Sequence, residues 1–366
     1  MDNQFLDNIA IVIPSYNPDE STVMLIQQIN AIYPAPIIVV DDGSRPETQA
    51  IFDRIKQFAN AVVLKHNVNL GKGRALKNAF NYYLSEFESN LGVVTADADG
   101  QHAPEDIFKC IYQLQANPGH LILGVRNFSQ FDVPWKSRLG NNATRRVMSS
   151  LTGVKISDTQ TGLRGIPGSF MKNLINLHGE RFEFETGMLL EAQKLNIPIS
   201  EVTIQTIYDN ANRGTHFRPT LDSLKIYRLI FRHALVQLFK FLCSGVFSAL
   251  VDLGFFSLFY YQLCREFQTG RLLAAVVLAR LISLTVNYLT NKLLVFREHS
   301  KRLFNAKSFG KYLLLCAVIM FASYFLTKFV GRFFNDRALL LIKCGVDVTL
   351  FFSSFLLQKH LVFKRS

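Results

Sequence analysis

The chain has 366 residues, of which 49% are hydrophobic, and a formal net charge of +12 at pH 7. Before Phe231 there are 22 Lys and Arg and 23 Asp and Glu, whereas from Phe231 onward there are 18 Lys and Arg and only 5 Asp and Glu. The basic excess therefore lies in the apolar second part, where membrane topology explains it better than nucleic-acid binding, and we expect no nucleic-acid partner. The five cysteines show no CxxC and no ligand-like spacing, which disfavours a disulfide or zinc framework.

The first part alternates short apolar runs with amphipathic stretches. Strands are predicted at 9–13, 37–40, 62–64 and 92–96, and helices at 22–32 (with Ser21 as N-cap), 46–59, 72–87 and 104–115. This alternation predicts an α/β, Rossmann-like domain with a mostly parallel sheet and helices on both faces.

Two carboxylates follow the predicted strand 92–96. Asp97 and Asp99 are two residues apart, so on extended backbone both side chains point to one face while Ala98 points to the other. This pair, with Gln101 as a neutral oxygen ligand, suits Mg²⁺ or Mn²⁺, which completes its shell with substrate phosphate oxygens. Taken alone, Asp-Ala-Asp-Gly is equally well explained as an ordinary polar turn.

Polar residues also follow the first two strands, as Tyr16-Asn17 and Asp41-Asp42. Ligands bind at the carboxyl ends of the strands in open parallel sheets, so we expect these residues and the aspartates to meet in one crevice. Lys72 opens the next helix within a glycine-rich segment, 69–74, that would suit close approach to the phosphates or ribose of a donor. This segment lacks the P-loop spacing and no GxGxxG follows a strand, which disfavours kinase and dehydrogenase functions.

Five motifs in chain order resemble those of family-two glycosyltransferases with the GT-A fold. They are Pro14-Ser15-Tyr16-Asn17, Val40-Asp41-Asp42-Gly43-Ser44, Asn69-x-Gly71-Lys72-Gly73, Asp97-Ala98-Asp99-Gly100-Gln101 and Asp158-x-Gln160-Thr161-Gly162-x-Arg164. Within that family the chain is most similar to the polyprenyl-phosphate branch, which includes dolichyl-phosphate mannose synthase and bacterial GtrB-type glucosyltransferases. The resemblance covers about the first 230 residues, and five ordered motifs are far more specific than any single one.

The resemblance implies roles for the residues in these motifs. The nucleoside would be held by Pro14, Tyr16 and Asp42, the metal on the donor pyrophosphate by Asp97, Asp99 and Gln101, the acceptor phosphate by Arg126 and Arg138, and the sugar by Glu183 and Glu185. With the neighbouring residues Asn17, Asp41, Lys72 and Ala98, these residues make up the predicted nucleotide-sugar site.

Transfer to a phosphate acceptor makes two demands on such a site. The charge of the leaving nucleoside diphosphate must be neutralised, whereas the acceptor monoester is mostly dianionic at pH 7 and needs no strong general base. Forked guanidiniums are suited to holding two anions together, and Arg126, Arg138 and Arg164 are candidates, whereas we expect Arg145 and Arg146 to be solvated. Asp158 either orients the acceptor or caps the following turn. The predicted catalytic residues are Asp99, Asp158, Arg126 and Arg138.

Four apolar runs follow, at 234–263, 272–296, 309–330 and 338–357, each near or above the roughly 20 residues that span a bilayer. Basic residues are densest at 297–311 and in the tail, which predicts a cell-membrane protein with a cytoplasmic first domain and cytoplasmic termini. The basic, amphipathic stretch Leu221 to Phe231 should lie at the headgroup level. We therefore expect a GT-A domain at 1–213, a juxtamembrane linker at 214–233 and a membrane domain at 234–366.

The apolar runs form a tandem repeat. Asn291-Lys292-Leu293-Leu294-Val295-Phe296 matches Gln358-Lys359-His360-Leu361-Val362-Phe363, which predicts two helical hairpins. This half resembles the GtrA family of four-helix membrane proteins, with which such transferases occur fused, and the resemblance implies a scaffold or flippase for polyprenyl-phosphate sugars. Arg280 and Asp347 occupy equivalent positions, and because ionisable groups at membrane depth normally pair, Arg280 should pair with Asp252 or Asp347.

The sequence thus predicts a metal-dependent, inverting glycosyltransferase that moves a hexose from a nucleotide sugar to a polyprenyl phosphate for cell-envelope glycosylation. Pro18 and Thr215-His216 depart from the Glu and Ser-Lys of mannose synthases, which favours a UDP-sugar such as UDP-glucose over GDP-mannose. A processive polysaccharide synthase is disfavoured because Trp135, the one tryptophan, is out of place for a QxxRW-like motif. The intact acidic motifs disfavour a lipid-linked sugar transporter with a degenerate transferase domain. Homo-oligomer formation stays open.

Overall fold

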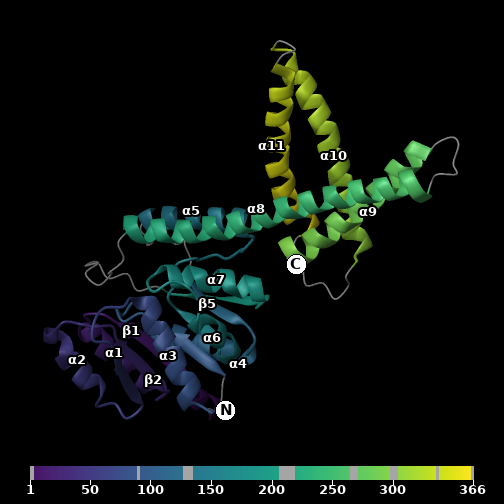
Figure 1. Ribbon diagram of the computed structural model, residues 1–366. Helices are drawn as coiled ribbons and strands as arrows, with labels where there is room; N and C mark the ends of the chain where they lie inside the picture. The colour runs from purple at the N-terminus through teal and green to yellow at the C-terminus, as the bar shows by residue number, and fades with distance from the viewer. Residues whose placement is uncertain are drawn as a thin grey trace. The chain divides into compact units, whose positions relative to one another are not determined.

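The fold is described from a computed structural model that covers residues 4–88, 91–126, 135–205, 219–263, 271–296, 304–334 and 338–363. Contacts between residues divide the chain into two units, Met1–Phe231 and Arg232–Ser366. The first unit is an α/β domain, and the second consists of long apolar helices (Figure 1).

A seven-stranded sheet forms the centre of the first unit, with the strands in the order β3-β2-β1-β4-β6-β5-β7. The strands are β1 (Ile9–Ser15), β2 (Ile37–Asp41), β3 (Ala61–Lys65), β4 (Gly92–Thr95), β5 (Leu121–Arg126), β6 (Arg164–Pro167) and β7 (Ile199–Ile204). Neighbours pair in parallel, except that β6 is antiparallel to both β4 and β5. The predicted mostly parallel sheet with an α/β fold is confirmed.

Helices cover both faces of this sheet, and the alternation of side chains along β1 separates two cores. Ile9, Ile11 and Ile13 pack with residues of α1, α2 and α4, whereas Ala10 and Val12 pack with residues of α3, α6 and α7. The helices of this unit are α1 (Glu20–Ile32), α2 (Gln49–Ile55), α3 (Lys72–Glu86), α4 (Pro104–Ala116), α5 (Trp135–Thr152), α6 (Gly168–Ile175) and α7 (Glu183–Leu195).

Two local predictions were wrong. The N-cap of α1 is Asp19, whose Oδ1 accepts a hydrogen bond from the Ser21 backbone at 2.9 Å, rather than Ser21 itself. The predicted helix at 46–59 is a 3₁₀ turn, Pro46–Thr48, followed by the two-turn α2. Both are errors at helix ends, where capping chemistry rather than apolar periodicity decides the boundary.

The antiparallel strand β6 has a consequence for function. Because β6 runs against β4, its first residue, Arg164, pairs with Thr95 at the carboxyl end of β4. The segment that leads into β6, including Gly162, therefore lies beside the residues that follow β4. Strand and helix periodicity alone could not predict this juxtaposition.

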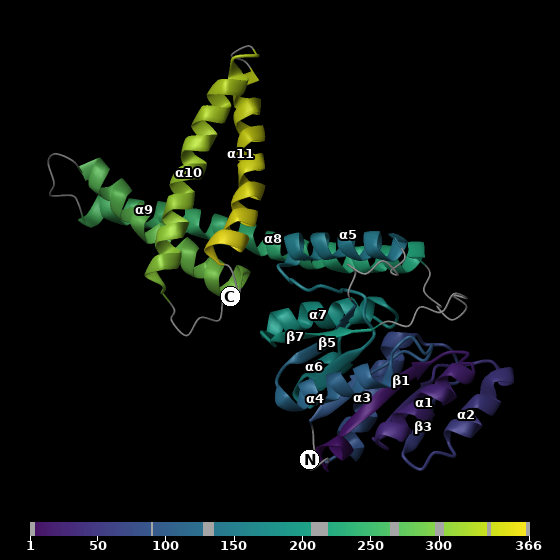
Figure 2. The same ribbon diagram turned by 180° about the vertical axis from the view of Figure 1, so that it is seen from behind.

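The helix α8 (Pro219–Leu258) begins inside the first unit. Ile226 and Ile230 are buried in the same core as α3 and α7, and the Tyr227 hydroxyl lies 3.3 Å from the Thr144 hydroxyl of α5. In both views α5 and this first part of α8 lie side by side (Figure 1 and Figure 2). The Ile226–Ile230 side of the stretch 221–231 is therefore buried in protein, and its predicted position at the headgroup level stays a prediction.

The second unit contains the rest of α8 and three further long helices. These are α9 (Arg271–Thr290), α10 (Ala306–Gly331) and α11 (Leu339–Leu357), and α9 and α11 each continue into a π-helical turn, η4 (Asn291–Val295) and η6 (Gln358–Val362). Four helical segments are long and apolar enough to cross a membrane: Asp222–Gln262, Leu272–Val295, Ala306–Gly331 and Leu341–Val362. The four predicted spans are confirmed by length and composition.

The two halves of the second unit use equivalent positions for their polar contacts. Asn291 Nδ2 donates to Gln358 Oε1 at 3.1 Å, which joins the two repeated motifs. Arg280 lies 3.4 Å from Asp252 Oδ2, so the predicted pairing is confirmed, with Asp252 as the partner. Asp347 instead accepts from Ser323 at 2.6 Å and pairs with Lys343.

Candidate functional site

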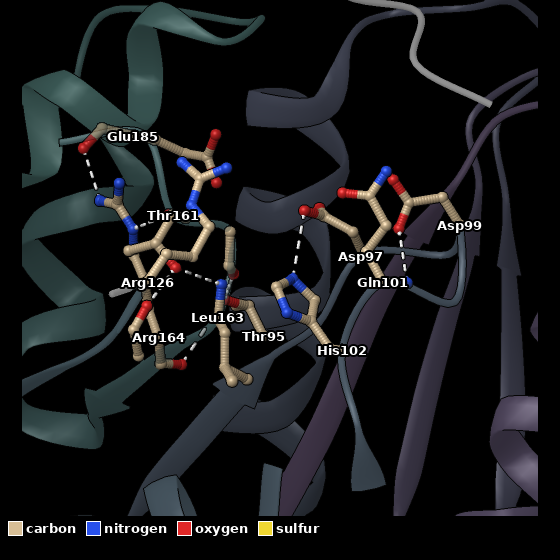
Figure 3. A network of polar contacts seen from close by, with 12 residues as sticks. Thr95, Asp97, Asp99, Gln101, His102, Arg126, Thr161, Leu163, Arg164 and Glu185 are labelled. Atoms are coloured by element: carbon tan, nitrogen blue, oxygen red, sulfur yellow. Dashed lines mark hydrogen bonds and ion pairs between the residues drawn. The ribbon is translucent and has the colours of Figure 1, made fainter. Parts of the chain in front are cut away.

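The polar motifs that follow β1, β2 and β4 lie at one edge of the sheet. These strands are neighbours and run parallel, so their carboxyl ends coincide as expected. Pro14 and Ser15 close β1, Asp41 closes β2, and the residues from Ala96 onward follow β4. Figure 3 shows the part of this edge that follows β4, with residues from β5 and from the segment leading into β6 beside it.

The loops after β1 and β2 are tied to each other. Asn17 has a positive φ of 49°; its backbone N–H donates to Ser44 Oγ, and its side-chain oxygen accepts from the Arg45 backbone, both at 2.9 Å. The buried Asp41 carboxylate accepts from Ser44 N at 2.8 Å and from Gln49 Nε2 at 3.2 Å. Both residues therefore shape the loops beside Tyr16, which is half-buried.

The Asp42 carboxylate is engaged by protein groups. It accepts from the backbone N–H groups of Leu70 and Gly71 at 2.9 and 2.8 Å, and its Oδ1 lies 2.8 Å from His66 Nδ1. Asn78 holds the other ring nitrogen of His66 at 2.8 Å. These contacts use most of the acceptor capacity of one carboxylate, so Asp42 clamps the loop before α3, and its nucleoside role stays a prediction. Sequence analysis missed His66, although it directly follows β3.

Lys72, the first residue of α3, reaches into the site. Its ammonium group lies 2.6 Å from Asp97 Oδ1 and 2.9 Å from Glu185 Oε1. Burial opposes the charged form, but the two carboxylates outweigh it and raise the pKa of Lys72 above its ordinary value. Gly71 precedes Lys72 with a φ of 103°, and a Cβ there would lie 2.4 Å from the Glu180 carbonyl oxygen.

Asp97 is held on three sides. Besides Lys72, His102 Nε2 lies 3.4 Å from Asp97 Oδ2, and Figure 3 shows the His102 ring pointing at this carboxylate. On the third side stands Gly162, where a Cβ would be only 2.3 Å from Oδ2. Burial would raise the pKa of Asp97, but the Lys72 charge and the His102 contact hold it well below its usual range. His102 was not among the predicted site residues.

Asp99 lies on the same loop as Asp97, but its pKa is shifted in the opposite direction. Burial and the nearby charge of Asp97 raise its pKa above the ordinary value, and its Oδ1 accepts from the Gln101 backbone at 3.1 Å. The Ala98 carbonyl accepts from Ser21 and Thr22 hydroxyls at 3.2 and 2.8 Å, which anchors the loop to α1.

The residues of this loop fit a hard divalent cation. Asp97 and Asp99 are close enough for the charge of one to disturb the titration of the other, which is the condition a shared cation relieves. Among the described residues no group of three His, Cys, Asp or Glu side chains is arranged for a metal. A two-carboxylate site suits Mg²⁺ or Mn²⁺, which keep coordination positions for phosphate oxygens and water.

The two predicted sugar-pocket glutamates have different surroundings. Glu185 is 7% exposed and faces Lys72. Glu183 instead turns back along the chain, where its Oε1 accepts from the Glu180 and Arg181 backbone at 3.2 and 3.4 Å. The structure brings Glu185 to Lys72 and Asp97, and uses Glu183 to organise the start of α7.

Arg126, at the end of β5, forms a two-bonded ion pair with the fully buried Asp158. Its Nε and one terminal nitrogen lie 2.7 and 3.1 Å from the two carboxylate oxygens. Asp158 Oδ1 also accepts from the Gln160 backbone at 3.0 Å, so it does cap the following turn. Arg126 is about a fifth exposed, and the pairing fixes its guanidinium at the site edge.

Arg164 is 1% exposed, so its guanidinium lies inside the protein, and its role toward an acceptor phosphate stays a prediction. Its guanidinium donates to the carbonyl oxygens of Thr161 and Glu185 at 2.9 and 2.6 Å. Burial lowers the pKa of Arg164, and the charges of Glu185, Asp158 and Asp97 oppose that shift. Arg164 thus supports the site from within, by joining the start of β6 to α7.

The remaining predicted positions divide into two sets. Arg145 and Arg146 of α5 are exposed, as expected. The Arg138 side chain, Thr215 and His216 lie outside the residues that the structure describes.

Comparison with known proteins identifies both halves of the chain. The family model of glycosyl transferase family 2 matches residues 10–172, and that of the GtrA/DPMS transmembrane domain matches residues 240–363. A UDP-N-acetylglucosamine–dolichyl-phosphate N-acetylglucosaminyltransferase from Methanococcus voltae is 30% identical over 246 residues, which cover 61% of this chain and 94% of that protein. The chain belongs to glycosyl transferase family 2. It is a glycosyltransferase with a GtrA-type membrane domain, and an integral membrane protein.

This family-2 glycosyltransferase is also similar to a second dolichyl-phosphate transferase and to a solved structure of a glucosyl-3-phosphoglycerate synthase. A dolichyl-phosphate beta-glucosyltransferase from Dictyostelium discoideum is 25% identical and covers 63% of this chain and 76% of that protein. A glucosyl-3-phosphoglycerate synthase from Mycobacterium tuberculosis, crystallised with Mn²⁺, UDP and glucosyl-3-phosphoglycerate, is 20% identical, with a TM-score of 0.45 over 62% of this chain and 77% of that one. The chain falls within the polyprenyl-phosphate sugar transferases.

Proposed function

We propose that this glycosyltransferase moves a hexose, with inversion, from a UDP-sugar such as UDP-glucose to a polyprenyl phosphate. The observation that carries the proposal is the Asp97–Asp99 pair with Lys72 at the carboxyl edge of the sheet, in a chain with four candidate membrane spans. The UDP donor named for the Methanococcus relative supports uridine over guanosine.

In this proposal Asp97 and Asp99, with Gln101, would hold Mg²⁺ or Mn²⁺, which when bound neutralises charge on the leaving diphosphate. Lys72 adds a cation at the same place from the protein itself. The acceptor phosphate is mostly dianionic at neutral pH, so it attacks the anomeric carbon without a strong base. Arg126 is held by Asp158 in one orientation and would fix the acceptor phosphate, together with Arg138.

The test uses the purified full-length protein and labelled UDP- and GDP-sugars with undecaprenyl phosphate, with and without EDTA. We expect a chloroform-soluble, EDTA-sensitive product from one UDP-sugar. A product formed only from GDP-mannose would show that the donor is GDP-mannose and not a UDP-sugar. Full activity in the Asp97→Asn, Asp99→Asn double variant would overturn the assignment of the site.

The same proposal places the catalytic unit and both termini in the cytoplasm, where nucleotide sugars are available. The basic bias of the segment 297–311 and of the tail supports this orientation. A green fluorescent protein fused to the C-terminus should fluoresce in cells, because it folds in the cytoplasm; a dark fusion that is exported and protease-accessible would contradict the orientation.

A further inference from the structure

Lys72 bridges two carboxylates, of which only one belongs to the proposed metal site. Its ammonium group contacts Asp97 Oδ1 at 2.6 Å and Glu185 Oε1 at 2.9 Å. The Lys72 side chain is 15% exposed and that of Glu185 9%, against 31% for Asp97. The ammonium thus has a second, more enclosed anionic partner on the side of α7.

The backbone of Lys72 is fixed while its side chain is long. Gly71, just before it, is held by Asp42 at 2.8 Å, and the packing of Gly71 against the Glu180 carbonyl leaves no room for a Cβ. A lysine has four side-chain torsions and a compact, mobile charge. The ammonium can therefore shift between neighbouring anions without any movement of α3.

The Lys72 ammonium contacts Oδ1 of Asp97 at 2.6 Å, whereas Oδ2 faces His102 at 3.4 Å. A Mg²⁺ or Mn²⁺ ligand oxygen lies about 2.0–2.2 Å from the metal, and an ammonium hydrogen-bonded to the same oxygen would stand within a few Å of that ion. Gly162 faces both oxygens of Asp97 from the opposite side, since a Cβ there would lie 2.3 Å from Oδ2 and 2.7 Å from Oδ1. A divalent ion that binds Oδ1 therefore competes with Lys72 for this oxygen.

We propose that Lys72 is a tethered counter-ion of Asp97, which it occupies while the metal is absent and leaves for Glu185 and the donor diphosphate when metal and donor bind. This inference rests on the proposed function, since it needs a metal and a diphosphate at this site. It makes the two ligands bind cooperatively: metal alone competes with Lys72 for Asp97 Oδ1, whereas a diphosphate offers Lys72 a new partner. The enzyme then holds little metal without its donor.

The test measures Mn²⁺ binding to the full-length protein from the EPR signal of free Mn²⁺, with and without UDP or GDP. Binding by the Asp97→Asn, Asp99→Asn double variant is subtracted as background. We expect Lys72→Met to bind Mn²⁺ about tenfold more tightly than the unaltered chain without nucleotide, and nucleotide to tighten Mn²⁺ binding by a smaller factor in this variant.

Equal Mn²⁺ affinity in both proteins, or equal tightening by the nucleotide, would overturn the proposal, as would the absence of Mn²⁺ binding from both. Lys56→Met is the matched control, because Lys56 pairs with Asp53 at 2.9 Å on the surface and should leave Mn²⁺ binding unchanged. If Lys72→Met does not fold, Lys72→Gln carries the same expectation. Sugar transfer by the unaltered chain is measured separately, so a negative result for Mn²⁺ binding by the Lys72 variants does not contradict the proposed sugar transfer.

Discussion

Replacing Gly162 by alanine should impair the reaction through a single contact. The added Cβ would lie 2.3 Å from Asp97 Oδ2 and 2.7 Å from Oδ1. Gly162 does not have a left-handed backbone conformation, so alanine is compatible with the chain itself. The Gly162 carbonyl accepts from the Thr95 hydroxyl at 2.7 Å, which holds this peptide in place and leaves the Asp97 carboxylate as the group that must move.

The size of the effect follows from the distance that Asp97 must move. Ordinary van der Waals contact begins at 3.4 Å, so the Asp97 carboxylate has to shift by about 1 Å, a misplacement that typically costs about 100-fold in rate. That factor corresponds to about 2.7 kcal/mol of transition-state stabilisation.

The assay is kcat/KM for transfer to undecaprenyl phosphate, with Mn²⁺ affinity as a second measurement. Gly119→Ala is the control, because a Cβ at Gly119 meets no atom within 4 Å. Activity of Gly162→Ala equal to that of the control would refute the claim that Asp97 is positioned by this contact, and with it the assignment of Asp97 to the reacting end of the site.

Three further outcomes are expected. Because burial and Asp97 raise the pKa of Asp99 above its ordinary value of about 3.9, protonation should weaken Mn²⁺ binding as the pH falls from neutrality toward that value; constant affinity would contradict this. Ile230→Ala should lower the unfolding free energy by about 2–5 kcal/mol and the thermal midpoint with it, whereas Leu224→Ala, 66% exposed on the same helix, should not. Arg280→Leu should lower the unfolding free energy by up to about 3 kcal/mol, because it leaves the Asp252 carboxylate without its cation at membrane depth. Asp252→Asn in the same chain should restore thermal stability. An unchanged thermal stability in the single variant would contradict this.

The sheet edge was predictable because it depends on local signals. Apolar runs closed by Asp41-Asp42 and by Asp97 mark strand ends, and parallel strands bring such ends together without further information. The position of Gly162 was not predictable in the same way. It depends on the direction of β6, which lies between β4 and β5 and is antiparallel to both. No pattern within the four residues Arg164–Pro167 encodes that direction.

Side-chain roles were harder to predict than positions. The motif at Arg164 indicates a cation near the acceptor, but its burial beneath α7 depends on contacts with Thr161 and Glu185 that are distant in the sequence or made through backbone. The same holds for the stretch 221–231, where basic and apolar residues indicate a membrane surface. Whether its apolar side contacts lipid or protein depends on the tertiary packing of the first unit, in which Ile226 and Ile230 belong to the hydrophobic core.

The entry of α8 into the first unit limits how the catalytic half can be produced by itself. A chain ending before Pro219 would lack Ile226 and Ile230, both at most 5% exposed, and would thereby lose two apolar side chains from the core that also contains residues of α5 and α7. A chain ending soon after Phe231 keeps that core but carries Leu224 and Phe231 on its surface, 66% and 51% exposed. A water-soluble transferase fragment therefore has to retain the start of the first membrane helix and replace its exposed apolar residues.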